Sequence, residues 1–324
     1  MTLANELQNL YTNTDIALKH CNEILTEKKA GTAATLYEVG DKISLIKADY
    51  GELIDGSIAE IEIPYSVRDI RAGAFYGCKN LIDINLVDRY IHTIGDYAFC
   101  DCTGLTTFVI PFDTTTIGKG AFKDCVGLKS FDLTTNSGHI TSIEAETFSG
   151  CVNLETINCT GTYGLYDGIN GINHIGEAAF KDCKNLVCPN IHCPDISSYA
   201  FSGCTSLTNL KVGGSPNCVI SSYAFGGCIN LEKVIITSDV TLCEHSFDGS
   251  NLTSLVLTNT RDITTSNNSD ISMTDVLINT PIAQGNGYIY VYSSILSDYL
   301  SHPQWSAYTS QFRTIEDYPD ILNN

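Results

Sequence analysis

The chain has 324 residues, with 37 Asp and Glu against 18 Lys and Arg, which gives a net charge of −19 at neutral pH. Such acidity argues against nucleic acid or an anionic membrane as a partner, because binding to either depends on basic side chains. The hydrophobic content of 43% excludes wholesale disorder. No run of 18 apolar residues is present, so the sequence predicts no insertion into a membrane.

At the N-terminus, residues 1–29 are predicted to form a helix. Apolar residues recur at three- and four-residue spacings from Leu3 to Ile24, a stripe typical of a coiled coil. Two roles stay open, namely a homo-oligomer formed through this helix and a helix folded back on the rest of the chain. Residues 1–18 contain no Lys or Arg, and no apolar core of a signal peptide follows. We therefore expect synthesis in the cytoplasm without a signal peptide.

A repeated frame organises the centre of the chain. The 17-residue pattern of residues 94–110, IGDYAFCDCTGLTTFVI, occurs in seven full copies from residue 70 and in an eighth, 242–257, that is one residue shorter and has Ser250 in place of Cys; starts are 21 to 32 residues apart. Recurrence at this period is the signature of a solenoid. Burying the six apolar side chains of one copy is worth roughly 9–18 kcal/mol, whereas ordering its roughly 23 residues costs about 1–2 kcal/mol each. A single copy cannot fold alone, so the copies must stack.

Each copy is expected to contain a strand and a tight helical turn. The end of the frame, Leu-x-x-Φ-x-Φ, alternates as a strand does, and strands of successive copies should pair in parallel about 4.8 Å apart. The segment Ala-Phe-x-x-Cys predicts the helical turn. Residues 52–69 form a partial copy, in which Ile58, Ile61 and Ile63 alternate, and this copy should cap the first edge of the array.

The frame I-x-x-x-A-F-x-x-C-x-x-L-x-x-I-x-L resembles the BspA-like subclass of leucine-rich repeats. The resemblance implies an α/β repeat fold, a leucine-rich-repeat solenoid with a parallel β-sheet. It also implies an extracellular or surface-displayed binding protein rather than an enzyme.

Cysteines follow the same frame. Seven of the fourteen occupy one frame position, which predicts a buried ladder of reduced thiols rather than disulfides. These seven are Cys78, Cys102, Cys125, Cys151, Cys183, Cys204 and Cys228.

Only one group of residues suggests a metal, namely Cys183, Cys188, His192 and Cys193, with His174 nearby in the sequence. Its spacing of five and five differs from that of zinc sites, so no metal site is predicted. Motifs of hydrolases, zinc proteases, phosphate-binding loops and EF-hands are missing from the sequence. Neither catalytic residues nor a cofactor are predicted.

The outward positions of the predicted strands form a neutral face rich in Thr, Asn and Ser, which we expect to be concave. Asp83 and Asp132 are its only carboxylates, and Cys188, Ile235 and Val256 also fall on it. Such a face would suit a glycan or a protein surface, and it is equally what β-propensity places on a solvated sheet. Its candidate binding residues are Asn85, Thr107, Asp132, Thr156, Asn158, Asn190, Asn209, Lys211 and Lys233.

The longest gap between copies is an insertion at residues 160–173, TGTYGLYDGINGIN. Tyr163 and Tyr166 in this loop complete the candidate binding residues, because insertions in repeat proteins often lie on the binding face. The alternative is a tolerated loop without a role.

Past residue 258 the frame ends. Residues 259–276 predict a loop, GYIYVY (287–292) a strand, and SSILSDYL (293–300) a helix capped by Ser293 or Ser294 and stopped by Pro303. Trp305 is predicted to be an apolar plug in a small α+β cap. The chain thus divides into an N-terminal helical module for oligomerisation or attachment (1–50), the solenoid (51–258) and a C-terminal capping module (259–324).

The two end modules carry a second resemblance. KKAGTAATLYEVGDKI (28–43) and the terminal W-S-A-Y and T-I-E-D-Y-P motifs resemble modules of gut-phage tail and virion-associated proteins. This implies a non-catalytic recognition or structural protein of a phage virion. Residues 1–50 would then bind other virion proteins, and the solenoid would face a host cell-surface protein or glycan. The alternative is a surface adhesin-like protein of a gut bacterium or protist, located at the cell surface or outside the cell.

Overall fold

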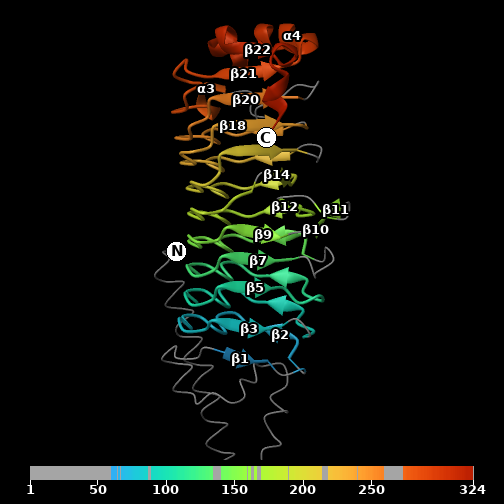
Figure 1. The fold of residues 1–324 in the computed structure, drawn as a ribbon, viewed down its shortest axis with the longest axis vertical. Helices are drawn as coiled ribbons and strands as arrows, with labels where there is room; N and C mark the ends of the chain where they lie inside the picture. The colour runs from blue at the N-terminus through green and yellow to red at the C-terminus, as the bar shows by residue number, and fades with distance from the viewer. Residues whose placement is uncertain are drawn as a thin grey trace, which may run out of the picture.

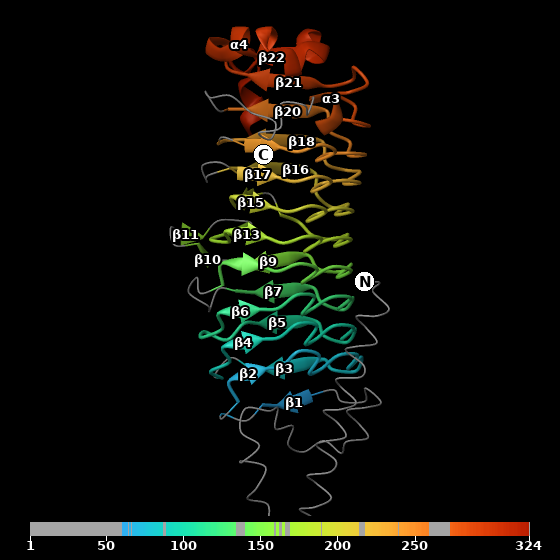
Figure 2. The ribbon, with the colours of Figure 1, turned by 180° about the vertical axis from the view of Figure 1, so that it is seen from behind.

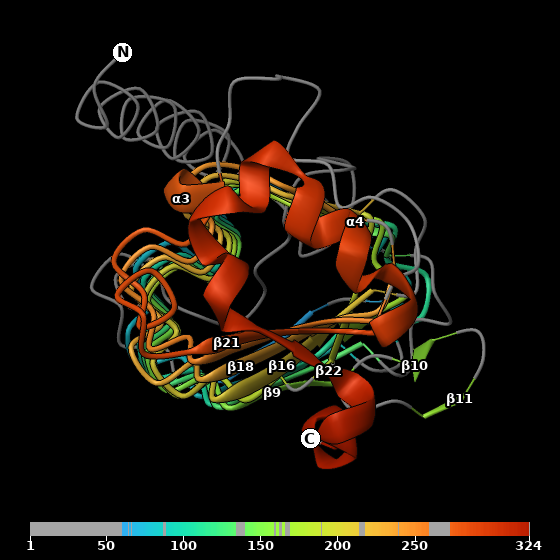
Figure 3. The ribbon, with the colours of Figure 1, turned by 90° about the horizontal axis from the view of Figure 1, so that it is seen from above.

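The computed structural model describes residues 60–323, apart from 64, 66, 87–88, 134–139, 159, 162–163, 166–168, 189, 214–217, 239 and 259–272. The predicted module of residues 1–50 lies outside the described residues. Figures 1 and 3 together show the described chain wound into coils that stack in one near-straight column. The coils follow the order of the sequence, from β1 at one end to α4 at the other.

One side of the column is the main sheet, to which each coil contributes a strand. Its strands up to the last copy are β1 (Glu60–Glu62), β3 (Asp83–Asn85), β5 (Thr107–Val109), β7 (Ser130–Asp132), β9 (Thr156–Asn158), β12 (Ile169–Asn170), β14 (Asn190–His192), β16 (Asn209–Val212), β18 (Lys233–Ile236) and β20 (Ser254–Leu257). Hydrogen bonds join these strands in parallel within three stretches, β1 with β3, β5 to β9 and β12 to β20, which confirms the predicted stacking. The pairing of β1 with β3 also places the partial copy at the first edge of the array.

A second row of strands, which the sequence analysis missed, forms another side of the column (Figure 2). It consists of β2 (Asp69–Ile70), β4 (Thr93–Ile94), β6 (Thr116–Ile117), β8 (Ser142–Ile143), β13 (His174–Ile175), β15 (Asp195–Ile196), β17 (Cys218–Ile220) and β19 (Val240–Leu242). In each of these short strands the buried residue is the first apolar residue of the frame, as Ile94 and Ile117 show. Strands of two or three residues are too short for their alternation to be recognised in a sequence.

The predicted helical turn is wrong. The residue before Ala and the residue before Cys have left-handed backbones, as at Tyr97 (φ 54°) and Asp101 (φ 60°), and the corresponding residues of the other seven copies do too. Amide groups then alternate in direction: Ala98 N–H donates to Gly95 O within the turn (3.2 Å), and Phe99 N–H donates to Ala121 O in the next coil (2.7 Å). A helix would keep all of these bonds local, whereas this backbone uses half of them to join coils.

Between the sheets and the turns lies one continuous apolar core. The frame phenylalanines stack along the column from Phe75 to Phe247, with centroids of successive rings 5.0 to 5.7 Å apart. All seven ladder cysteines are buried, and the twelve cysteines that the structure describes are all free, which confirms the reduced ladder. Regular stacking of identical side chains follows from the sequence repeat.

The C-terminal module extends the main sheet beyond the last copy. Strands β21 (Tyr288–Val291) and β22 (Phe312–Thr314) continue it in parallel, and β21 confirms the predicted strand. The remaining elements are α3 (Met273–Val276), η3 (Ser293–Ile295), α4 (Leu296–Ser301), η4 (Pro303–Gln311), η5 (Ile315–Asp317) and η6 (Pro319–Leu322). In Figure 3 the helices around α4 lie over the open end of the column.

Trp305 confirms its predicted role as an apolar plug in this cap. It is 1% exposed, and its ring lies 5.4 Å from that of Tyr299 and 5.7 Å from that of Phe312. The core therefore ends on a large aromatic side chain, so that the last coil does not expose its apolar edge.

Two local predictions for this module are wrong. No serine side chain caps the helix, because Ser293 already lies inside η3 and its hydroxyl and N–H donate to the Glu316 carboxylate at 3.0–3.2 Å. Residues 273–276 form α3 rather than loop, since Asp275 O accepts the amide of His245 (2.7 Å) and so continues the row of turns. No helix among the described residues has the length and apolar character needed to cross a bilayer.

Candidate binding surface

We call the surface made by the outward side chains of the main sheet the strand face. Because the column is near-straight, this face is close to flat along it rather than concave as predicted (Figures 1 and 3). The register sets Thr107 beside Ser130 and Ser130 beside Thr156. Parallel strands lie about 4.8 Å apart, so these hydroxyls form a close row.

Three predicted binding residues come together in this first half of the face. Thr107 and Thr156 are exposed, and Asp132 between them is half-buried. Asn85 and Asn158 take outward register positions on β3 and β9, and their side chains are outside the described part of the chain. Hydroxyl and carboxylate groups in adjacent rows can bind hydrogen-bonding groups of a ligand.

Four further candidates gather on β14, β16 and β18. The register pairs Asn190 with Lys211 and Asn209 with Lys233, and all four side chains are half-buried. Burial and then the positive charge of Lys211 lower the pKa of His192, which lies on the same face. Burial lowers the pKa of Lys233 as well.

Cys188 was expected on the strand face and lies in the core instead. It is 3% exposed, and its thiol donates to Asn190 O at 3.4 Å. The strand of this coil, β14, begins two residues later. A proline occupies position 189, and a proline has no N–H with which to extend the ladder toward Cys188.

The end of the chain covers the other apolar members of the face. Residues 315–323, the C-terminal segment, turn back over the main sheet, and in Figure 3 the C-terminus lies outside the ring of coils against that sheet. Ile315 packs with Ile235, Val256 and Tyr290, and these four residues are 3%, 2%, 0% and 8% exposed. The predicted solvated strand face is therefore covered along one row from Ile235 onward, whereas Lys233 and Ser254 in the next row stay partly exposed.

Other contacts hold the C-terminal segment in place. Tyr318 sits edge-on against Tyr290, with ring centroids 5.7 Å apart, and Ile321 packs on the same cluster. Lys233 Nζ donates to Asn323 O, which connects a predicted binding residue to the chain's own terminus. Outward apolar residues in two successive copies, Ile235 and Val256, were the sequence signal for this cover.

The insertion interrupts a strand rather than lengthening a loop between coils. After β9 the chain forms an antiparallel hairpin, β10 (Thr160–Gly161) with β11 (Gly164–Leu165), and then β12 resumes the main sheet, with Ile169 beside Ile191. In Figure 3 this hairpin projects from the rim of the column, beyond the strand ends. Tyr163 and Tyr166 lie outside the described residues.

The structure separates the suspected metal ligands. Cys183 donates its thiol to Phe148 O (3.1 Å) in the core, whereas His174 bonds Asp195 (2.8 Å) on the second row of strands. The described part of the chain holds no group of three or more residues placed to bind a metal ion.

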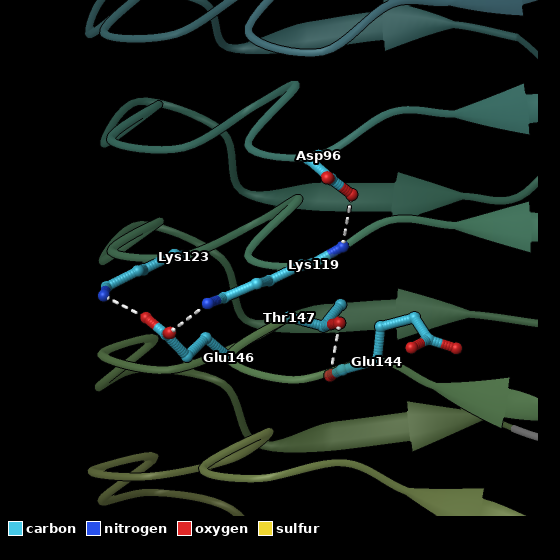
Figure 4. A network of polar contacts seen from close by, with 6 residues as sticks. All are labelled: Asp96, Lys119, Lys123, Glu144, Glu146 and Thr147. Carbon is cyan, nitrogen blue, oxygen red and sulfur yellow. Dashed lines mark hydrogen bonds and ion pairs between the residues drawn. The ribbon is translucent and has the colours of Figure 1, made fainter. Parts of the chain in front are cut away.

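On the turn side of the column, charges pair with one another (Figure 4). Lys119 Nζ lies 3.2 Å from the Glu146 carboxylate, Lys123 Nζ bonds its other oxygen, and Asp96 accepts the Lys119 N–H at 2.8 Å. Burial alone would raise the pKa of Glu146, but the hydrogen bonds and charges of the two lysines outweigh burial and lower it. This network links neighbouring coils, and its lysines and carboxylates neutralise one another.

Comparison with known proteins agrees with this architecture. The family model for the BspA-type leucine-rich repeat region matches in six copies over residues 54–167 and 167–274, which is more than half of the chain. No curated protein matches the chain.

Several solved structures are similar in fold. A leucine-rich-repeat protein from Eubacterium ventriosum shares 23% identity at a TM-score of 0.38 and covers 60% of this chain, which spans only 44% of that protein. A leucine-rich cell surface protein from Faecalibacterium prausnitzii shares 19% (TM-score 0.33, 78% of this chain and 82% of that one). The pneumococcal vaccine antigen PcpA shares 17% (TM-score 0.38, 80% and 66%). Similarities of this size carry no argument about function.

Proposed function

The chain belongs to the BspA-type leucine-rich-repeat family, and on that premise we propose that it is a non-catalytic, adhesin-like binding protein. Its ligand is a protein or glycan on a cell surface, and its place is the cell surface or the extracellular space. One observation carries the proposal: apart from Val109, the outward side chains on the uncovered part of the strand face, from β5 to β16, are hydrogen-bonding groups and a few charges in regular rows. A face of this kind recognises without reacting.

The binding residues are those of the two groups on the strand face. Thr107, Asp132 and Thr156 serve one half, with Asn85 and Asn158 in the adjoining register positions. The other half contains Asn190, Asn209 and Lys211, with Lys233 at the border of the C-terminal segment. The insertion with Tyr163 and Tyr166 is a second contact region on the rim of the column.

Residues 1–50 are proposed to attach the solenoid to its carrier or to a second copy. Placement in a phage virion, bound to virion proteins through this module, rests on the resemblance of residues 1–50 and 259–324 alone. Both settings use the same division into module, solenoid (51–258) and cap (259–324), and the same strand face.

The test is binding of fluorescently labelled protein to a panel of gut bacterial strains. Thr107→Arg combined with Thr156→Arg places two bulky cations on the proposed face, and we expect at least about a tenfold loss of binding to every strain that wild type binds. Thr116→Arg is the control, because Thr116 is an exposed strand threonine that lies on the second row instead of the strand face. Equal binding by the double variant and wild type would refute the strand face as the recognition surface.

A further inference from the structure

One row of outward side chains on the strand face is half covered and half open. The register runs from Asn190 to Lys211, Ile235, Val256 and Tyr290 on neighbouring strands. The C-terminal segment covers the last three of these, while Asn190 and Lys211 remain partly exposed. The edge of a built intramolecular contact therefore lies directly beside Lys211.

The C-terminal segment shows what this face accepts. It is a short polypeptide of nine residues, 315 to 323, and its carboxylates bond within the cap rather than to the face, since Glu316 accepts from Ser293 and Asp317 from Thr314. It packs apolar side chains on the sheet, and a lysine of the face, Lys233, donates to its main-chain oxygen at Asn323. A polypeptide is thus already bound on this face through a combination of apolar contact and a lysine hydrogen bond.

The open neighbouring surface has the opposite charge to the rest of the protein. The outward residues of β14, β16 and β18 include two lysines, Lys211 and Lys233, and no Asp or Glu, in a chain of net charge −19. None of the ion pairs within the described ranges involves Lys211. The lysines of the turn side are different, since Lys119 and Lys123 both pair with Glu146.

We propose that the surface formed by Asn190, His192, Asn209 and Lys211 binds an acidic segment of a partner protein, which lies alongside the C-terminal segment. This inference rests on the proposed binding function and specifies its ligand at this end of the strand face. Lys211 attracts the partner's carboxylates, and the two asparagine amides bind its main chain.

The test uses the full chain and a defined probe. A short fluorescein-labelled peptide of alternating Glu and Ser is titrated with the protein, and the matching Gln-Ser peptide is its neutral control. We expect binding of the acidic peptide that weakens as salt rises, and no binding of the neutral one. Lys211→Glu should weaken binding at least about tenfold.

A matched variant separates this site from general electrostatics. Lys184→Glu makes the same charge change at an exposed residue outside the strand face, and it should leave the affinity within about twofold of wild type. Thermal melting of each variant checks that it is folded. Equal losses from Lys184→Glu and Lys211→Glu, or wild type that does not bind the acidic peptide, would overturn the proposal.

The failures of the two proposals are distinguishable. If the Thr107→Arg, Thr156→Arg variant loses cell binding while the acidic peptide does not bind wild type, the strand face functions with a different ligand and only this inference fails. If the peptide binds at Lys211 but the Thr107→Arg, Thr156→Arg variant binds cells as well as wild type does, the broader strand-face proposal fails.

Discussion

The thiol of Cys102 donates a hydrogen bond to the carbonyl oxygen of Phe75 in the preceding coil, at 2.9 Å. The same bond recurs up the column, from Cys125 to Phe99 O and from Cys151 to Phe122 O, each at 3.0 Å. A disulfide would remove this donor. The contact therefore gives each reduced thiol a hydrogen-bond partner, which another small apolar residue at this frame position would lack.

Replacing one ladder thiol should destabilise the fold. Cys151→Ala removes a fully buried sulfur and leaves the Phe122 carbonyl without that donor, so we expect the free energy of unfolding to fall by about 1–3 kcal/mol. Cys243→Ala, at a half-buried cysteine outside the ladder, should cost less than about 1 kcal/mol. Urea denaturation monitored by circular dichroism gives both values, and equal losses would contradict a special role for the ladder.

Stability should fall in alkaline solution because of the same thiols. Burial raises the pKa of Cys78 to about 11 and that of Cys228 to about 12. Unfolded thiols ionise near pH 8.5, so above that value the unfolded state loses protons that the folded state keeps, and each such thiol lowers the unfolding free energy by about 1.4 kcal/mol per pH unit. Below about pH 8 both states hold the proton and this contribution is fully present.

Other groups also titrate in this range, so the measurement is a difference between variants. Urea midpoints at pH 7.5 and 9.5, values chosen to bracket the ~8.5 pKa of a free thiol, are compared for wild type and Cys228→Ala. The variant should lose less stability than wild type over the interval. An identical loss in both proteins would show that Cys228 keeps an ordinary pKa in the folded state.

Adjacent alanines in one turn should respond oppositely to glycine. Ala178 has φ 54°, a backbone that costs a residue with a Cβ about 1–2 kcal/mol, so Ala178→Gly should be neutral or stabilise by up to about 1 kcal/mol. Ala179 is fully buried with an ordinary backbone, and Ala179→Gly should destabilise by about 0.5–1 kcal/mol. Thermal unfolding of the two variants side by side tests the left-handed turn, and a helical turn would make both substitutions destabilising.

The cover of the strand face should depend on Ile315. Ile315→Ala removes a buried anchor from the cluster with Ile235 and Val256, and we expect a loss of about 2–4 kcal/mol. Leu322→Ala is the matched control, because Leu322 is 40% exposed and should change stability by no more than about 0.5 kcal/mol. Dye binding to exposed apolar surface should rise for the first variant only. Unchanged dye binding and stability would mean that the C-terminal segment does not cover the face in solution.

Much of the candidate site followed from alternation within the frame. Thr107 and Thr156 were placed outward because inward and outward positions alternate along a strand, and the register confirms that they lie in one row. Cys188 occupies the same frame position as these threonines, Ile235 and Val256 occupy the next outward position, and all three are buried. Their burial depends on an interrupted strand and on a segment some sixty residues or more away in the sequence, and neither belongs to the repeat.

By itself, the sequence determined the stacking of copies, the parallel main sheet, the reduced cysteine ladder and the aromatic plug at Trp305. The first three follow from the order of apolar and polar residues within one copy. Trp305 follows from the end of that order, where a large apolar residue is needed to close the core. Only the tertiary structure decided the left-handed turns, the second row of strands, the hairpin inside β9–β12 and the cover over Ile235. These arise where a backbone amide or an apolar side chain finds its partner in another coil, and that choice minimises exposed apolar surface and unbonded amides over the whole column.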